Sequence, residues 1–194
     1  DAVLRADQPI TGALRASAAY ASAYHPIYGT PVDPRLLEAY RRQVASFDEG
    51  MRLRDVPVHA VDIPFEGARM QSYLLPAEGH ETEVRPLIIM VNGYDATITD
   101  MYFPMGVAAA RRGYHVLLFD GPGQGGMLYV QGVPLRADWE VVVSAVIDYA
   151  VTVPIVDAGR IAVHGWSLGG YLAPRAASGD DRIAACIADP GQWD

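Results

Sequence analysis

Hydrophobic residues follow a helical period in the first part of the chain. In residues 33–51 they recur three or four positions apart, at Leu36, Leu37, Tyr40, Val44 and Phe47. Asp33 and Pro34 are residue types favoured at the start of a helix. With a shorter helix over 14–24, this pattern predicts a helical N-terminal segment, residues 1–55, whose apolar face must pack against another surface.

From residue 56 the pattern becomes that of strands, and then of strands alternating with helices. Residues 56–65 and 69–75 alternate apolar and polar positions around a hairpin turn. Residues 87–92 are almost uniformly apolar, as expected of a parallel strand covered on both faces. Further helices are predicted at 100–113, 136–152 and 168–178, and further strands at 114–120, 160–165 and 182–189. We predict an α/β fold over residues 56–194, with a mainly parallel sheet, an antiparallel start and flanking helices.

Charge and composition narrow the classes of function. The chain carries 23 acidic and 15 basic side chains, a net charge of −8, without a cluster of Lys or Arg, so nucleic acid is not an expected partner. No apolar run approaches the roughly 20 residues of a membrane span, and the first residues lack the features of a signal peptide. We therefore expect a cytoplasmic protein with no membrane partner.

The single cysteine, Cys186, excludes an internal disulfide framework and a thiolate-rich metal site. Because it lies within the apolar run 182–188, we expect it to pack in the core. No metal or other cofactor is expected.

The sequence HGWSLGGY, residues 164–171, contains the candidate nucleophile. Gly165, Ser167 and Gly169 fit the pattern G-x-S-x-G, with a predicted strand before it and a predicted helix after it. A serine at the apex of a strained strand-to-helix turn brings the residues two before and two after it together, where only glycine avoids a collision. The alternative is a glycine-rich turn that carries an ordinary surface serine.

Two backbone amides are candidate oxyanion donors. The strand 87–92 is followed by Gly93 and Tyr94, at the place where this motif takes its second donor. We expect the N–H groups of Leu168 and Tyr94 to hold a tetrahedral oxyanion. Trp166 and Tyr102, with Tyr94, are candidate apolar walls of a substrate pocket, although such aromatic residues are more often core residues.

A second glycine-rich stretch, FDGPGQGG at 119–126, follows a predicted strand. It lacks the Lys-Ser/Thr of a phosphate-binding loop and the G-x-G-x-x-G spacing. We therefore interpret it as a structural loop in which Asp120 is a hydrogen-bonding anchor.

The segments HGWSLGGY, NGYDATITDMYF and FDGPGQGG together resemble the α/β-hydrolase superfamily. Within it they are similar to the branch that holds 2,6-dihydroxypseudooxynicotine hydrolase, the fungal pigment-pathway polyketide hydrolases and the FrsA-like proteins. The resemblance runs from about residue 56 to the end. It implies that the helical segment 1–55 helps to form a cap, and that the reaction is carbon–carbon bond hydrolysis beside a ketone or ester hydrolysis.

A serine nucleophile needs a base, and in this superfamily the acid and then the histidine follow the serine in the chain. All five histidines precede Ser167, namely His25, His59, His80, His115 and His164. His164 is expected to be a packed or hydrogen-bonded sheet residue beneath the serine, and His59, His80 and His115 to lie away from it. His25, in the N-terminal segment, is the alternative that could reach a cap-facing pocket.

Among the acidic residues after the serine, Asp189 is the candidate within the chain, whereas Asp180 and Asp181 are expected in a solvated loop. The resemblance implies an acid one strand later than Asp189. We therefore expect these residues to be the N-terminal part of a longer protein, or one chain of a split one, whose further segment carries the acid and base. Alone, they would form a sheet with an exposed edge and negligible hydrolysis.

The leading hypothesis is a serine hydrolase of a small carbonyl compound, acting by carbon–carbon or ester hydrolysis. An acylaminoacyl-peptidase-like hydrolase is the alternative within the same class. The rival from another class is a hydrolase-like fold kept for binding or regulation. A homodimer through the N-terminal helices is an alternative that their apolar face allows.

Overall fold

The computed structural model describes residues 9–29, 31–54 and 58–192. The chain divides into two compact units that meet between Val58 and His59. The boundary expected from the sequence, between residues 55 and 56, falls within residues 55–57, which lie outside the described ranges.

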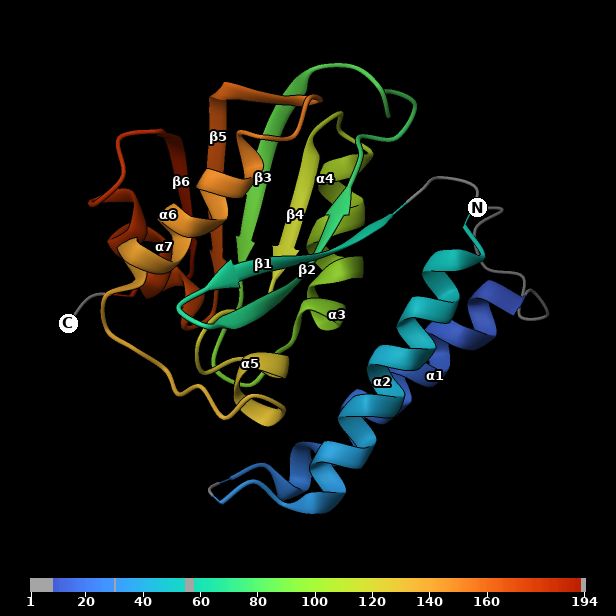
Figure 1. Cartoon of the computed structure of the whole chain (residues 1–194). Helices are drawn as coiled ribbons and strands as arrows, with labels where there is room; N and C mark the ends of the chain where they lie inside the picture. Colours follow the sequence, from blue (N-terminus) through green and yellow to red (C-terminus); the bar gives the residue numbers. More distant parts are fainter. Residues whose placement is uncertain (1–8, 30, 55–57, 193–194) are drawn as a thin grey trace. The chain divides into compact units, whose positions relative to one another are not determined.

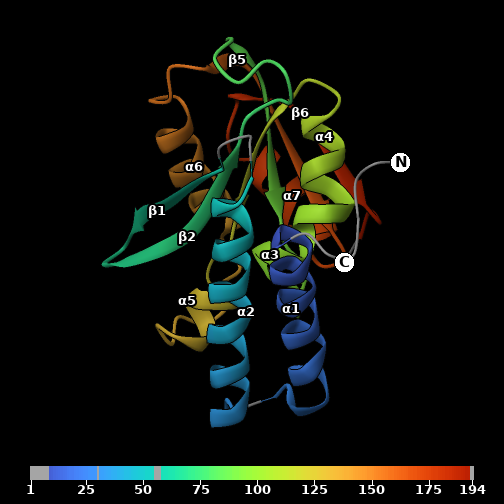
Figure 2. The same ribbon diagram turned by 90° about the vertical axis from the view of Figure 1, so that its right-hand side faces the viewer.

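The N-terminal unit is a pair of helices. Helix α1 (Pro9–Tyr24) continues into a 3₁₀ turn, η1 (His25–Ile27), and helix α2 spans Pro34–Arg52. Asp33 caps α2 by accepting a hydrogen bond from the Arg35 N–H at 2.8 Å. The two helices pack side by side (Figure 2). Helix α1 begins before the predicted position 14.

The second unit is built on a six-stranded sheet with the order β1-β2-β4-β3-β5-β6 (Figure 1). The β1–β2 and β2–β4 pairs are antiparallel, whereas β3–β4, β3–β5 and β5–β6 are parallel. The predicted antiparallel start and parallel continuation are therefore confirmed. The strands are β1 (His59–Phe65), β2 (Ala68–Leu75), β3 (Arg85–Val91), β4 (His115–Phe119), β5 (Val156–Trp166) and β6 (Ile183–Asp189).

Helices cover both faces of this sheet (Figure 2). On one face lie α6 (Trp139–Ala150) and α7 (Gly169–Ala177), and on the other lies the segment 98–110. That segment, predicted as one helix, is α3 (Ile98–Met101), a π-helical turn η2 (Tyr102–Val107) and α4 (Ala108–Ala110). The π turn contains Pro104, which has no N–H to give to a regular helix. A short helix, α5 (Gly125–Tyr129), was not predicted.

The main core lies between the sheet and the helices α6 and α7. Alternate residues of β3, Leu87, Ile89 and Val91, are fully buried there together with Trp139 of α6. The Trp139 ring lies 6.0 Å from that of Phe119, centroid to centroid. Every residue of β4 is buried, as expected of an interior strand with helices on both sides.

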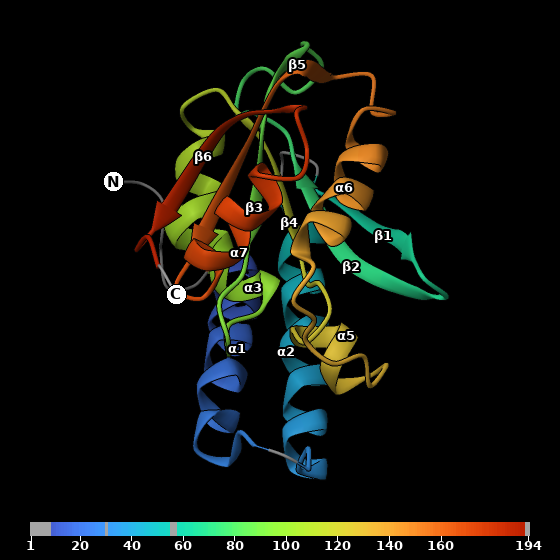
Figure 3. The same ribbon diagram turned by 90° about the vertical axis from the view of Figure 1, so that its left-hand side faces the viewer.

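Among the described strands, β6 pairs with β5 alone and forms one edge of the sheet (Figure 3). Ala184, Ala185, Cys186 and Ile187 are exposed along it. The prediction that Cys186 packs in the core is therefore wrong for the described chain. An apolar run predicts a strand, but it does not say how many neighbours that strand has.

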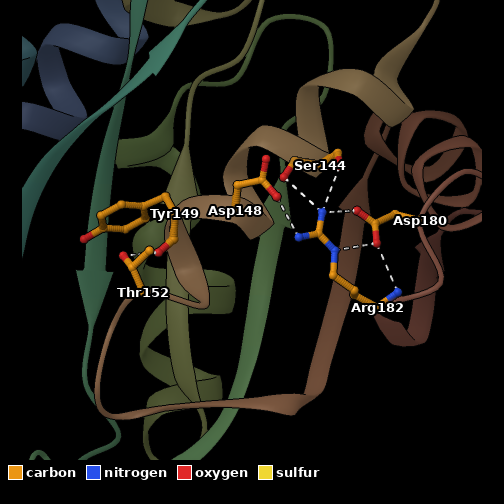
Figure 4. Close-up of polar contacts among 6 residues, drawn as sticks. All are labelled: Ser144, Asp148, Tyr149, Thr152, Asp180 and Arg182. Atoms are coloured by element: carbon orange, nitrogen blue, oxygen red, sulfur yellow. Dashed lines mark hydrogen bonds and ion pairs between the residues drawn. The ribbon is translucent and has the colours of Figure 1, made fainter.

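An ion-pair cluster joins the start of β6 to helix α6 (Figure 4). Arg182 donates to both carboxylate oxygens of Asp180, at 2.9 and 2.6 Å, and to Asp148 at 2.6 Å and Ser144 Oγ at 2.9 Å. Asp180 is buried, so the prediction of a solvated position is wrong for this residue, whereas Asp181 is exposed. Hydrogen bonding from Arg182 lowers the pKa of Asp180 to about 2.

Candidate active site

The serine turn joins β5 to α7. Ser167 follows the last residue of β5, is exposed, and has a φ of 56°, in the left-handed region that non-glycine residues rarely adopt. A side chain at position 165 would collide with the backbone carbonyl of Gly169, and one at 169 with the carbonyls of Val91 and Asn92. Both glycines are therefore required by close backbone approach, as the motif predicts.

The loop after β3 lies directly against the serine. A β-carbon placed on Gly93 would come within 2.9 Å of Ser167 Cβ and 3.4 Å of its Oγ. The peptide that carries the Tyr94 N–H begins at Gly93, and Leu168 stands immediately before helix α7. The structure thus brings the backbone of both candidate oxyanion donors next to Ser167.

A buried polar network lies beneath that loop. Asp120 Oδ1 accepts hydrogen bonds from Asn92 Nδ2 at 2.7 Å and from the Ile98 N–H at 2.9 Å, which confirms the predicted anchor role. Burial raises the pKa of Asp120 to about 7, against the opposing effect of its hydrogen bonds. Gln124 belongs to the same network. The sequence did not identify it as a site residue, because its one distinguishing feature there is its position between two glycines.

Among the described residues, neither His115 nor His164 is hydrogen-bonded to Ser167. His115 accepts from the Ala77 N–H at Nδ1, 2.8 Å, and its Nε2 lies 2.9 Å from the Glu83 carbonyl oxygen, at the opposite end of the strands from Ser167. His164 is half-buried in β5, its Nδ1 has no partner among the described residues, and desolvation lowers its pKa. Within the described ranges, no hydrogen bond engages the Ser167 hydroxyl.

The three aromatic candidates for pocket walls differ in their surroundings. Tyr94 is 60% exposed, whereas Tyr102 is fully buried, with its ring edge-on to Phe103. Trp166 is half-buried and lines a cavity of about 480 Å³ between the segment 104–112, β3, β5 and β6. Ile187 and Asp189 of the edge strand line the same cavity. Burial makes Tyr102 a packing residue, and it does not line this cavity.

The described residues contain no group of three or more His, Cys, Asp or Glu side chains placed to hold a metal ion. None of their helices is both long and apolar enough to cross a membrane.

Residues 88–194 match the family model described as the alpha/beta hydrolase family. Together with the sheet order and the strained serine between glycines, this match shows that the chain belongs to the α/β-hydrolase family.

Particular relatives agree with that assignment. The chain is 43% identical over 176 residues to 20-hydroxy-prefusarin hydrolase FUS2 of Gibberella moniliformis, covering 87% of this chain and 42% of that protein. It is 42% identical over 199 residues to Hydrolase acrC of Aspergillus aculeatus, covering 93% and 46%. The crystal structure of 2,6-dihydroxy-pseudo-oxynicotine hydrolase superposes with a TM-score of 0.78 at 29% identity, covering 93% of this chain and 48% of that one. The chain thus spans less than half the length of these relatives.

Proposed function

We propose that Ser167 is the nucleophile of a hydrolase that acts on a small carbonyl compound. The observation that carries this proposal is the left-handed backbone of an exposed serine, held between two glycines that cannot accept a β-carbon. Such strain is costly and persists where the surrounding structure enforces it, which occurs most often at functional sites.

In this proposal Ser167 Oγ attacks the carbonyl carbon and the N–H groups of Tyr94 and Leu168 stabilise the oxyanion. Leu168 stands at the N-terminal end of α7, where the aligned peptide dipoles favour negative charge. The carbon–carbon or ester bond next to the attacked carbonyl then breaks, and the departing enolate or alkoxide takes up the proton that the serine hydroxyl gave to the base. Water hydrolyses the acyl-enzyme that is left.

We favour a small-molecule substrate because two similar proteins are named as hydrolases of 20-hydroxy-prefusarin and of 2,6-dihydroxy-pseudo-oxynicotine. Carbon–carbon cleavage is the first choice and ester cleavage the second. The peptidase-like alternative and the non-catalytic alternative predict, respectively, turnover of acyl-peptides and no turnover that depends on Ser167.

We further propose that the acid and base of the triad come from polypeptide that adds to the edge of β6. Two observations support this proposal. Ala185 to Ile187 are exposed on β6, which has one neighbour among the described strands. An apolar cavity opens beside β6 along Met90, Trp166 and Ile187. The relatives are more than twice as long as the matched region.

The test is turnover by the full-length protein of a p-nitrophenyl ester and of an aryl 1,3-diketone. Ser167→Ala should abolish hydrolysis of whichever substrate is used. Ser178→Ala is the matched control, because Ser178 is an exposed serine at the far end of the same helix, and its hydroxyl donates to the Arg175 carbonyl oxygen. Turnover that survives in Ser167→Ala would exclude the proposed nucleophile.

A further inference from the structure

Two buried side chains form hydrogen bonds to the loop that carries the candidate donor Tyr94. Asp120 and Gln124, at 0% and 2% exposure, come from the segment that follows β4. Neither contacts the serine hydroxyl through a hydrogen bond within the described residues. They bond instead to the backbone and side chains of the loop 92–98.

Gln124 is fixed at both ends of its amide. Its Oε1 accepts the Gly121 N–H at 3.0 Å, which identifies the other atom as the nitrogen donor. That Nε2 donates to the carbonyl oxygens of Asn92, at 2.9 Å, and Gly93, at 3.3 Å. A single side chain therefore determines where two successive carbonyl groups of the loop point.

The direction of a carbonyl fixes the direction of the next N–H. The peptide bond between Gly93 and Tyr94 is trans, since the cis bond found among the described residues is Asp189–Pro190. In a planar trans peptide the C=O and N–H point in opposite directions. Because the Gly93 carbonyl points toward Gln124, the Tyr94 N–H points away from it.

The nucleophile lies beside the Cα atom of Gly93. A β-carbon on Gly93 would meet Ser167 Cβ at 2.9 Å and the Trp166 carbonyl oxygen at 3.1 Å. The Gly93 backbone therefore lies next to both the Gln124 amide and the serine turn. Asp120 holds the two ends of the same loop through Asn92 and Ile98.

We infer that Gln124 is a positioning residue for hydrolysis, which aims the Tyr94 N–H at the oxyanion by holding the Gly93 carbonyl. This inference rests on the proposed function of Ser167. It assigns to the glycine-rich loop 121–126 a part in the reaction besides its part in the fold. Gln124 itself touches no reacting atom.

The test uses the full-length protein and hydrolysis of p-nitrophenyl acetate. Gln124→Met keeps an unbranched side chain of similar size and removes the donor. Loss of one well-placed oxyanion donor lowers kcat by about 10²–10³-fold, so a misaimed one should lower kcat at least about 10-fold, with KM changed less than about threefold. Gln131→Met is the matched control, because Gln131 also bonds backbone on both sides of its amide, at Arg69, but lies exposed and away from the loop.

Gln124→Glu adds a second measurement, the pH dependence of kcat, which a purely structural role of Gln124 would leave unchanged. Its charged carboxylate can donate to neither carbonyl oxygen, whereas the protonated acid has one O–H that can donate to one of them. We expect kcat of this variant, relative to wild type, to rise as the pH falls. If Gln124→Met does not fold, as shown by near-ultraviolet circular dichroism, the pH profile of Gln124→Glu decides the question.

The inference would be overturned if kcat of folded Gln124→Met stayed within twofold of wild type, or if the relative kcat of Gln124→Glu did not change with pH. Failure of the proposed function is a different result. In that case wild type shows no more turnover than Ser167→Ala, and the role of Gln124 in hydrolysis fails with it.

Discussion

Replacing Asp180 by asparagine removes the negative charge that pairs with Arg182 in the cluster between helix α6 and the start of β6 (Figure 4). The pKa of this carboxyl is lowered from 3.8 to about 2, chiefly by the hydrogen bonds from Arg182. At about 1.4 kcal/mol per pKa unit, the difference corresponds to about 2 kcal/mol of folding free energy. The Asp148 partner of Arg182 is largely exposed and contributes little.

The sign of the pH dependence follows from the lowered pKa. The unfolded chain binds a proton near pH 4 and the folded chain only near pH 2, so the stabilisation is complete above about pH 5 and is lost as the pH falls toward 2. Urea unfolding of wild type and Asp180→Asn at pH 7, 5 and 3 measures it. Asp181→Asn, at the exposed neighbouring position, should change stability by less than about 0.5 kcal/mol. Equal unfolding free energies of wild type and Asp180→Asn at pH 7 would refute the reasoning.

Three further predictions concern the serine turn, the loop anchor and a buried histidine. Gly165→Ala should destabilise the protein by about 3 kcal/mol or prevent folding, because the added methyl group would collide with the Gly169 carbonyl. Gly12→Ala is the control, since its methyl group would meet nothing within 4 Å and should leave stability unchanged. Thermal unfolding of the two variants measures the difference. Because burial raises the pKa of Asp120 to about 7, the unfolding free energy should fall as the pH rises from about 4 to 7, by about 4 kcal/mol at most, and urea titrations of Asp120→Asn should lack this slope. His115→Phe should cost about 1–3 kcal/mol in urea unfolding, since it leaves the Ala77 N–H and Glu83 carbonyl unpaired, with kcat unchanged; a loss of kcat in the folded variant would contradict a structural role.

The local pattern of hydrophobic residues and glycines was sufficient to predict most of the fold. The almost uniformly apolar run 87–92 predicts an interior strand, and β3 does pair with parallel neighbours on both sides. The spacing of Gly165, Ser167 and Gly169 predicts a strained turn, and the structure shows the positive φ and the close backbone contacts that require it. Both features depend on residues that are close together in the sequence, so the local pattern is enough to predict them.

Features that depend on distant partners could not be read from the sequence. Asp180 is buried because Arg182 and helix α6 surround it, and Cys186 is exposed because β6 has one neighbour. The role of Gln124 depends on hydrogen bonds between the loops that follow β3 and β4, and these loops are adjacent only in the folded structure. Pro104 marks the irregular helix 98–110, but a proline does not specify a π turn in place of a kink.

The central claim is that Ser167 is an activated nucleophile. The most direct test is the intact mass of the full-length protein before and after reaction with a fluorophosphonate, followed by peptide mapping. We predict one adduct on wild type, located at Ser167, and none on Ser167→Ala. Wild type that remains unlabelled, or an adduct that maps to another serine such as Ser178, would contradict the claim.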